Sequence, residues 1–497
     1  MSYSEEAREG AAGAVSASHH KDDSLGHTEV ASELVVPKRG QSWFRGNMFQ
    51  VTVLGMSSFL APGIWGAMAA TGGGGQQSVE LVNAANSSTF CLMIVTALLT
   101  SSMILVTNVR VALVFGMLGY APYAASLYCH GKYGTEWFVV FGAVLCGISA
   151  GTFWATEGTI ALAYPERSRH GIFISYWLMY RVLGQFIGGA INLGLNAHNN
   201  QAGSLSDDTY IVFVVLQCVG PLVAMLISLP HQVQRVDGTP VVIELEDTVW
   251  NEIKAVFKTF AKREVYLLIP MFWQSTFIES VIGTYAGKNF TVRARALGSL
   301  LSAVVASLAN YCVGGYLDWK RLSVSFRART AFITVYALQL GWLIFGIVKM
   351  NKLEDTPHEA IDWTDSEFHS AFAVYILLQM GYNMVYAYTY WIVGASASKG
   401  SHISRTASIV RAVESAGQAV AYGINSTSLR TDSAAGINMA FCAFSIPFSW
   451  FVVRRVGFAA DGSHLYQMPI YAENDEQREE IAKSAAVDTD AVLGEAK

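Results

Sequence analysis

Long runs of apolar residues recur along the chain, separated by short polar segments. A membrane-spanning helix needs about 20 mostly apolar residues, and runs of this length predict twelve such helices. Their predicted bounds are 49–71, 84–107, 111–129, 137–162, 172–195, 209–229, 265–287, 297–317, 330–349, 368–394, 406–428 and 436–453. Prolines inside these runs, such as Pro62 and Pro270, are tolerated in a bilayer because neighbouring helices bind the freed backbone groups. We expect them to kink the helices without ending them.

The polar segment 230–264 divides the predicted spans six and six. The fold class is therefore an all-α, multi-pass membrane protein with an N-terminal six-helix bundle at 46–229 and a C-terminal one at 265–455. Residues 1–45 have no long apolar run and predict a disordered cytosolic tail, and residues 456–497 predict an acidic cytosolic tail.

Within the linker 230–264, one helical stripe contains Trp250, Ile253, Phe257 and Phe260, and Lys254, Lys258 and Lys262 lie beside it. A helix with one apolar face and flanking lysines is typical of a segment that lies on a membrane surface. The alternative is a solvated linker helix.

Composition supports a lipid environment. Hydrophobic residues make up 52% of the chain and charged residues 14%, against roughly 25% charged in soluble domains, and the mean hydropathy is +0.34. A net charge of −5 does not favour nucleic-acid binding, which needs a clustered basic excess. The six cysteines lie in apolar runs without metal-ligand spacing, so we expect no metal, disulfide framework or cofactor.

Basic residues near the span ends predict the orientation. With both termini in the cytosol, most of them lie on the cytosolic side, as the positive-inside rule requires, among them Lys38, Arg39, Arg167, Arg169, Lys320, Arg321, Arg327, Arg454 and Arg455. Three Asn-x-Ser/Thr triplets, at Asn86, Asn289 and Asn425, fall on the opposite side and are candidate N-glycosylation sites. The compartment does not follow from these patterns.

Two spans share a motif. The fifth contains Gly184-Gln185 followed by Ile191-Asn192, and the eleventh contains Gly417-Gln418 followed at the same interval by Ile424-Asn425. The two occurrences are six spans apart, which predicts two duplicated, pseudo-symmetric halves.

Both spans carry a polar stripe, because residues three or four apart share a helix face. The fifth span contributes Arg181, Gln185, Gly188 and Asn192, and the eleventh contributes Arg411, Glu414, Gln418, Tyr422 and Asn425. A charge facing lipid costs at least about 2.5–3.5 kcal/mol, so we expect both stripes to line the protein interior.

The intramembrane charges are candidate cavity or gating residues. Glu157 and Arg181 lie at similar depths on neighbouring helices and could pair, as a structural lock, a gate or part of a substrate site. Arg411 and Glu414 are three residues apart, so a local ion pair competes with a ligand contact.

Glu279 has no basic residue near it in its own span, and it is either a proton or cation site or a hydrogen-bonded structural carboxyl. Aromatic residues concentrate in the same spans, where they either line a cavity or serve as packing and interface anchors. They are Trp154, Tyr176, Trp177, Tyr180, Trp273, Tyr382, Tyr386, Tyr388, Tyr390 and Trp391.

The sequence gives no support for catalysis, and we expect no catalytic residues. Gly147-Ile148-Ser149-Ala150-Gly151 matches a nucleophile-elbow pattern, but it lies inside an apolar helix and not at a strand-to-helix turn, so it predicts helix packing.

One region carries a family resemblance. It contains Ala155-Thr156-Glu157-Gly158, Tyr164-Pro165-Glu166, Tyr176-Trp177, Arg181 and Gly184-Gln185-Phe186-Ile187-Gly188-Gly189-Ala190-Ile191-Asn192. This stretch resembles the signature of Unc-93-like proteins of the fungal type, a branch of the major facilitator superfamily, and the general resemblance covers residues 45–455. The resemblance implies two six-helix bundles around a central cavity, with spans 1, 4, 7 and 10 innermost.

The superfamily's loop motif is similar to Gly314, Asp318, Lys320 and Arg321 after span 8, but it is reduced to Asn108 and Arg110 after span 2. We therefore expect a transporter-like protein in the lipid bilayer that moves a small solute or ion by alternating access. The family also implies an alternative, a non-transporting chaperone or regulatory partner of another membrane protein such as a channel or receptor.

Overall fold

A computed structural model describes residues 42–76, 78–165, 170–235, 241, 243, 245–319, 321–396, 400–458 and 462–465. These residues form helices joined by short connections, and their only β pairing consists of isolated bridges. Most of the two predicted tails lies outside them, as do Lys38, Arg39, Glu166, Arg167, Arg169 and Lys320.

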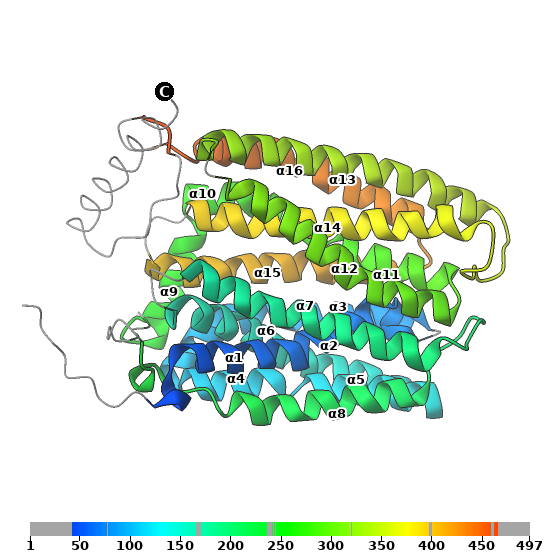
Figure 1. Cartoon of the computed structure of the whole chain (residues 1–497), viewed down its shortest axis with the longest axis horizontal. Helices are drawn as coiled ribbons and strands as arrows, with labels where there is room; N and C mark the ends of the chain where they lie inside the picture. Colours follow the sequence, from blue (N-terminus) through cyan, green and yellow to red (C-terminus); the bar gives the residue numbers. More distant parts are fainter. Residues whose placement is uncertain are drawn as a thin grey trace, which may run out of the picture. The chain divides into compact units, whose positions relative to one another are not determined.

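The long helices lie side by side (Figure 1) and occur where the apolar runs predict them. The first half contains α1 (Asn47–Ser58), η2 (Phe59–Gly63), α2 (Ile64–Ala70), α3 (Val79–Val106), α4 (Val109–Met117), α5 (Tyr120–Tyr133), α6 (Glu136–Ala163), α7 (His170–Asn196) and α8 (Asp207–Ala224). After α9 (Val249–Phe260), the second half contains α10 (Arg263–Ser275), α11 (Ile278–Asn289), α12 (Val292–Leu317), α13 (Val324–Asp355), α14 (Phe368–Ser396), α15 (Gly400–Asn425) and α16 (Thr431–Val453).

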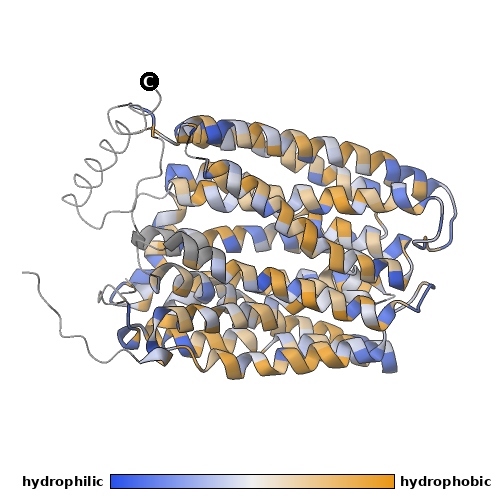
Figure 2. Cartoon of the chain, viewed as in Figure 1, coloured by the Kyte–Doolittle hydropathy of each residue, from blue (hydrophilic) through white to orange (hydrophobic). Residues whose placement is uncertain are grey.

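Among the described residues, nine helical segments are long and apolar enough to cross a membrane. Figure 2 shows hydrophobic residues along these helices and hydrophilic residues gathered mainly at their ends. The three remaining predicted spans correspond to α7, α14 and α15, which are helical but not among the nine. The count of twelve membrane crossings therefore stays a prediction.

Three predicted spans are interrupted helices. In the first, Pro62 lies in the π-helical turn η2 between α1 and α2, because proline has no N–H to donate within a helix. The third divides into α4 and α5, and the seventh into α10 and α11 at Thr276 and Phe277. The seventh span contains Pro270, but the helix runs through that proline and breaks six residues later. Pro270 therefore does not end the helix, as expected, and the interruption at Thr276 and Phe277 was not predicted.

The break in the seventh span coincides with close packing against α15. A Cβ atom on Gly417 would lie 2.0 Å from the carbonyl oxygen of Trp273, so only glycine allows this approach. The Thr276 hydroxyl lies 3.4 Å from the carbonyl oxygen of Glu414 on α15. Tertiary contacts with α15, and not a local breaker, accompany the end of α10.

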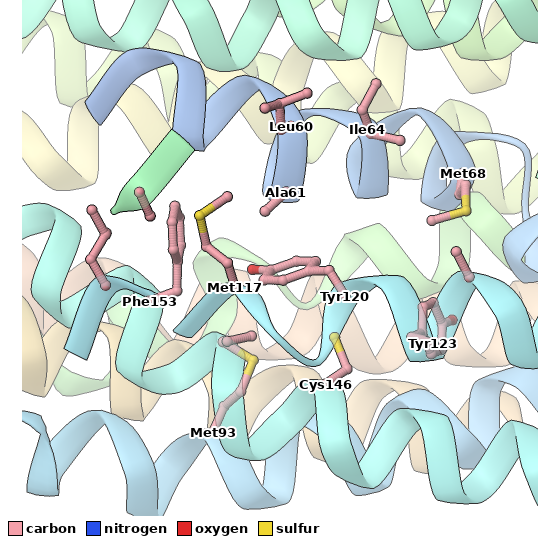
Figure 3. Packing of buried hydrophobic residues seen from close by; sticks show 14 of the residues in the cluster. Leu60, Ala61, Ile64, Met68, Met93, Met117, Tyr120, Tyr123, Cys146 and Phe153 are labelled. Atoms are coloured by element: carbon pink, nitrogen blue, oxygen red, sulfur yellow. The ribbon is translucent and has the colours of Figure 1, made fainter. Parts of the chain in front are cut away.

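The buried hydrophobic residues form separate clusters in the two halves. One cluster consists mainly of residues from α1 to α8, and Figure 3 shows Ala61 of the first span on the side that faces Met117 and Tyr120. Two further clusters consist of residues between Val256 and Val456. The residue bounds predicted for the two bundles stay a prediction.

Helices α3 and α6 pack closely through the small residues of the Gly147–Gly151 segment. A Cβ on Gly147 would lie 2.4 Å from the Thr89 carbonyl oxygen, and one on Gly151 would lie 2.0 Å from Thr96 Oγ1. Small residues at such interfaces let membrane helices approach each other. The nucleophile-elbow pattern is therefore a packing motif.

The two halves meet through two equivalent helix pairs. Helix α7 (span 5) packs against α12 (span 8), and α15 (span 11) packs against α3 (span 2). Exchanging the two halves turns span 5 into span 11 and span 8 into span 2, so the first pair generates the second, as a two-fold relation between duplicated halves requires. The repeat detected in spans 5 and 11 is thus part of the interface between the halves.

Candidate functional site

A small polar cavity lies between the two halves. Its volume is about 80 Å³, and its lining comes from η2, α2, α6 and α7 of the first half and from α11, α14 and α15 of the second. No lining residue comes from α4, α5, α8, α13 or α16. Five of the predicted site residues line this cavity: Arg181, Gln185, Glu279, Arg411 and Gln418.

The two cavity arginines share one aromatic platform. The guanidinium carbon of Arg181 lies 5.3 Å from the ring centre of Trp154, and that of Arg411 lies 4.4 Å from it. Arg181 also lies 5.6 Å from the ring centre of Tyr386. These distances are within the range of cation–π attraction, which strengthens where water is excluded. Trp154 and Tyr386 are therefore cavity residues, as one of the two interpretations of the aromatic residues predicts.

Arg411 forms the predicted local pair. Its Nη1 atom lies 3.4 Å from Oε2 of Glu414, three residues further along α15. Glu414 is buried behind the cavity and also accepts a hydrogen bond from the Tyr390 hydroxyl at 3.1 Å. Among the described residues, Nε of Arg411 has no hydrogen-bond partner. The pair therefore leaves part of the guanidinium group unused.

Glu157 does not form the predicted pair with Arg181. No ion pair joins them in the described part of the chain; instead Trp177 Nε1 donates to Glu157 Oε1 at 2.6 Å, and the Ser58 hydroxyl donates to the same oxygen. Glu157 is buried and does not line the cavity. These contacts join three helices of the first half, so Glu157 packs there with partners other than the predicted Arg181.

Glu279 lies in the first turn of α11, directly after the break in the seventh span. A carboxylate is stabilised there by the positive end of the helix dipole. Gln418 on α15 donates from Nε2 to Glu279 Oε2 at 2.6 Å. The break and the eleventh-span stripe thus place one carboxylate at the cavity wall.

The outer residues of the two polar stripes lie away from the cavity, whereas Gln185 both lines the cavity and contacts a neighbouring helix. Gln185 donates to Ser302 of α12 at 2.9 Å. Asn192 is buried and accepts a hydrogen bond from Asn196 at 3.1 Å. Asn425 donates to Ser280 at 3.1 Å. Both stripes face protein, as predicted, but only Arg181, Gln185, Arg411 and Gln418 of their members line the cavity.

The three candidate glycosylation asparagines are buried, which corrects that prediction. Asn86 accepts from the Tyr123 hydroxyl at 2.8 Å, and Asn289 donates to the Tyr285 carbonyl at 2.9 Å. Asn425 donates to the Ala421 carbonyl at 2.9 Å in addition to Ser280. A glycan on these amides would have no room, because each amide is enclosed by neighbouring side chains.

The loop motif after span 8 lies at the turn between α12 and α13, away from the cavity. The N–H of Asp318 bonds to the Gly314 carbonyl at 2.9 Å and ends α12. Arg321 is exposed, whereas Arg327 is buried and donates to the Leu317 carbonyl. After span 2, Asn108 caps α4, and Arg110 donates to the Ile227 carbonyl at 2.6 Å.

One buried arginine escaped the sequence analysis. Arg295, at the start of α12, is 3% exposed and donates to the carbonyls of Thr71 at 2.7 Å and Gly72 at 2.8 Å, and to that of Gly203 at 3.0 Å. It therefore fastens the second half to two loops of the first. Its position at the edge of a predicted span is typical of a charge at the membrane surface. No local sequence pattern distinguishes such a charge from a buried arginine that joins two halves.

A second missed contact holds α9. Glu252 is buried and receives hydrogen bonds from Arg405 of α15, from Nε at 3.1 Å and from Nη2 at 2.9 Å. Burial alone would raise the pKa of Glu252, but the Arg405 bonds and the backbone N–H of Glu246 outweigh it and hold that pKa below its ordinary value. Helix α9 packs against both α3 and α15, so this ion pair fixes the linker across the interface between the halves.

The opposite face of α9 carries the predicted apolar stripe. Trp250 is 64% exposed and Phe257 is 62% exposed, and the Lys254 ammonium lies 5.3 Å from the Trp250 ring centre. The helix is thus amphipathic, and its aromatic residues face away from the protein. This arrangement suits a membrane surface, where aromatic rings and lysines are favoured, and its placement there stays a prediction.

Comparisons with known proteins agree with this architecture. A family model described as "Ion channel regulatory protein UNC-93" matches residues 84–308. The chain is 43% identical to the notoamide biosynthesis cluster protein O' of Aspergillus versicolor over 84% of this chain and 91% of the relative. It is 28% identical to UNC93-like protein 1 of Arabidopsis thaliana over 81% of this chain and 89% of the relative.

Solved structures show the same fold. The chain matches a D-xylose–proton symporter with a TM-score of 0.56 at 11% identity, and the xylose transporter XylE from E. coli, in a partially occluded inward-open conformation, with a TM-score of 0.57 at 12% identity. Each match covers 81% of this chain and 97% of the other. At this identity the likeness shows the fold alone, which is that of the major facilitator superfamily.

Proposed function

The chain belongs to the UNC-93-like family of multi-pass membrane proteins, and from this premise we propose that it carries a small solute or ion across its membrane by alternating access. The observation that carries the proposal is the cavity between the halves, which holds Arg181, Arg411 and Glu279 at its wall. Charged groups in the middle of a membrane protein are costly. A polar or charged ligand in the cavity would offset the cost of placing three charged side chains around it.

The contacts at the end opposite α9 are suited to opening. Besides Arg295, the Tyr375 hydroxyl donates to the Ala70 carbonyl at 2.9 Å, and the Ser299 hydroxyl donates to the Ala67 carbonyl at 2.7 Å. Each such hydrogen bond contributes about 0.5–1.5 kcal/mol net, so a few of them hold the halves together without locking them. Breaking them together would open this end of the cavity.

At the other end, α9 packs against α3 of the first half and is joined to α15 of the second half by the Arg405–Glu252 pair. Alternating access requires that the two ends close in turn around a fixed site. The chain thus has a contact set at each end and a cavity between them. We further propose that both termini face the cytosol, as the distribution of basic residues predicts.

Reconstitution of the purified protein into liposomes tests this function. We expect uptake of at least one member of a panel of labelled small solutes, and we expect Arg181→Ala to reduce that uptake at least tenfold. The matched control is Arg321→Ala, which removes an exposed arginine away from the cavity. Uptake equal to that of empty liposomes across the panel would refute transport.

A second function, regulation of another membrane protein, is favoured by the printed description of the matched family model as an ion channel regulatory protein. Purification from native membranes in mild detergent discriminates between the two. A stoichiometric membrane-protein partner, together with no flux by the isolated chain, would support regulation. Flux by the isolated chain would support transport.

A further inference from the structure

We infer that the cavity binds a small amino acid in its zwitterionic form, with the carboxylate on Arg181 and Arg411 and the primary ammonium on Glu279 and Gln418. This inference rests on the proposed function, because it names the class of solute for the same cavity. It depends on the charges that face the cavity, on the hydrogen-bonding capacity they leave unused, and on the size of the void.

The cationic wall is available to a carboxylate. Within the described part of the chain, no carboxylate lies within ion-pair distance of Arg181, whose guanidinium group is instead held against Trp154 and Tyr386. Arg411 is more than nine-tenths buried, and its Nε has no partner beyond the pair made by Nη1. Guanidinium groups bind carboxylates in a bidentate, planar arrangement. The two neighbouring groups on one indole therefore form a carboxylate site.

The opposite wall carries acceptors for an ammonium group. Among the described residues, Glu279 receives one hydrogen bond, from Gln418 Nε2, and this orients the Gln418 amide because a carboxylate accepts but cannot donate. The Gln418 carbonyl oxygen Oε1 is then left without a partner among the described residues, although the residue is only 3% exposed. A primary ammonium has three N–H donors and satisfies both groups at once.

The charges face each other without touching. Glu279 interacts electrostatically with both Arg411 and Arg181, yet no ion pair joins it to either within the described residues. A ligand that carries both charges bridges this gap and neutralises both walls. A neutral solute would leave Arg181 and Glu279 desolvated and unpaired, and a simple anion would leave Glu279 unpaired, each of which is costly in a buried site.

The size of the void restricts the ligand further. Its volume of about 80 Å³ exceeds the roughly 10–15 Å³ that one water molecule needs by the same measure. This space suits a small polar ligand such as glycine, alanine or serine.

Equilibrium binding to the purified full-length protein in detergent tests the inference without requiring transport. Isothermal titration calorimetry would compare glycine, L-alanine and L-serine with three analogues. Propionate lacks the ammonium group, isopropylamine lacks the carboxylate, and glycine betaine lacks N–H donors. We expect at least one amino acid to bind, and each analogue to bind at least about tenfold more weakly. Loss of one charge-assisted hydrogen bond to a buried partner accounts for a change of that size.

Substitutions assign the two walls. Glu279→Gln should weaken amino-acid binding at least about tenfold and remove the preference over propionate, whereas Arg181→Gln should weaken the binding of both. Glu279→Asp keeps the charge and should preserve the preference. Glu136→Gln, at an exposed position outside the cavity, is the matched control. Size-exclusion profiles and melting temperatures verify that each variant is folded.

The outcomes separate the two proposals. No binding by any of the three amino acids, or a wild-type ratio of amino acid to propionate in Glu279→Gln, would overturn the zwitterion site. Liposome flux of another solute would then leave transport standing. Amino-acid binding without any flux would support the site and contradict transport.

Discussion

Replacing Arg295 by methionine should favour the conformation that is open at the end opposite α9. Methionine keeps much of the volume of the side chain but removes its donors. The carbonyl oxygens of Thr71, Gly72 and Gly203, which lie 2.7, 2.8 and 3.0 Å from the guanidinium nitrogens, would lose them. Each buried acceptor left unpaired costs about 1–3 kcal/mol.

The cost applies to one conformation only. Arg295 joins the second half to loops of the first, so its bonds exist while this end is closed and are absent once it opens. Because water will bind some of the freed carbonyls, we take about 3 kcal/mol as the free energy by which the closed conformation is destabilised. Each 1.4 kcal/mol is a factor of ten, so the open population should rise on the order of a hundredfold.

Cysteine accessibility measures this shift. Ala69 lines the cavity from α2, and Ala69→Cys in a background without the six native cysteines reports access to the cavity by a membrane-impermeant maleimide. We expect the labelling rate to increase by at least tenfold when Arg295→Met is added.

Arg293 is the matched control. It lies two residues before Arg295 and forms an ion pair with Asp362, but both Arg293 and Asp362 belong to the second half. Arg293→Met should therefore lower the stability without changing access. Unchanged labelling in Arg295→Met, or an equal increase in Arg293→Met, would refute the role of Arg295 as a contact that closes this end.

Three further predictions concern α9 and the helix interface. The pKa of Glu252 is lowered in the folded protein, so the pairing of Glu252 stabilises the fold above the unfolded-state pKa of about 4.3, and this contribution disappears as the pH falls through the folded-state pKa. Glu252→Gln should therefore lower the melting temperature at pH 7 and make the melting temperature fall less on acidification. A pH profile equal to that of the wild type would argue against the pair. Gly417→Ala should destabilise the protein by at least about 1–3 kcal/mol, because the new Cβ overlaps the Trp273 carbonyl. Thermal unfolding measures this loss, and Gly436→Ala is the control, because the Cβ added there meets open space. Replacing Trp250 and Phe257 by serine should leave the melting temperature nearly unchanged in detergent but reduce quenching of a fluorophore on α9 by brominated lipids in liposomes; equal quenching would place α9 away from the bilayer surface.

The positions of the helices could be predicted from the sequence because a membrane imposes a local rule. A helix that crosses lipid must be apolar over a fixed length, so α3, α12 and α16 are visible as hydrophobic runs. The Arg411–Glu414 pair was equally accessible, since two residues three apart on a helix lie on one face.

Other features depend on contacts between distant segments, which no local pattern contains. The seventh span breaks at Thr276, where α15 approaches closely at Gly417. Glu157 binds Trp177 and Ser58, and not Arg181, because three helices converge there. Asn425 satisfies a glycosylation motif but is enclosed by α11. In each case the partner is more than 100 residues away or belongs to another helix, so the depth of a residue could be predicted but its contacts could not.

The indole of Trp154 supports one guanidinium group from each half of the molecule, Arg181 from α7 and Arg411 from α15. Rotation of the halves apart would carry Arg411 away while Arg181 stays beside its ring, since α6 and α7 move together. An anion gripped by both groups would then lose one of its two counter-charges through the same movement that exposes it to solvent. Release of the anion would require no separate trigger, because the rotation of the halves would both lower the affinity of the site and expose it to solvent.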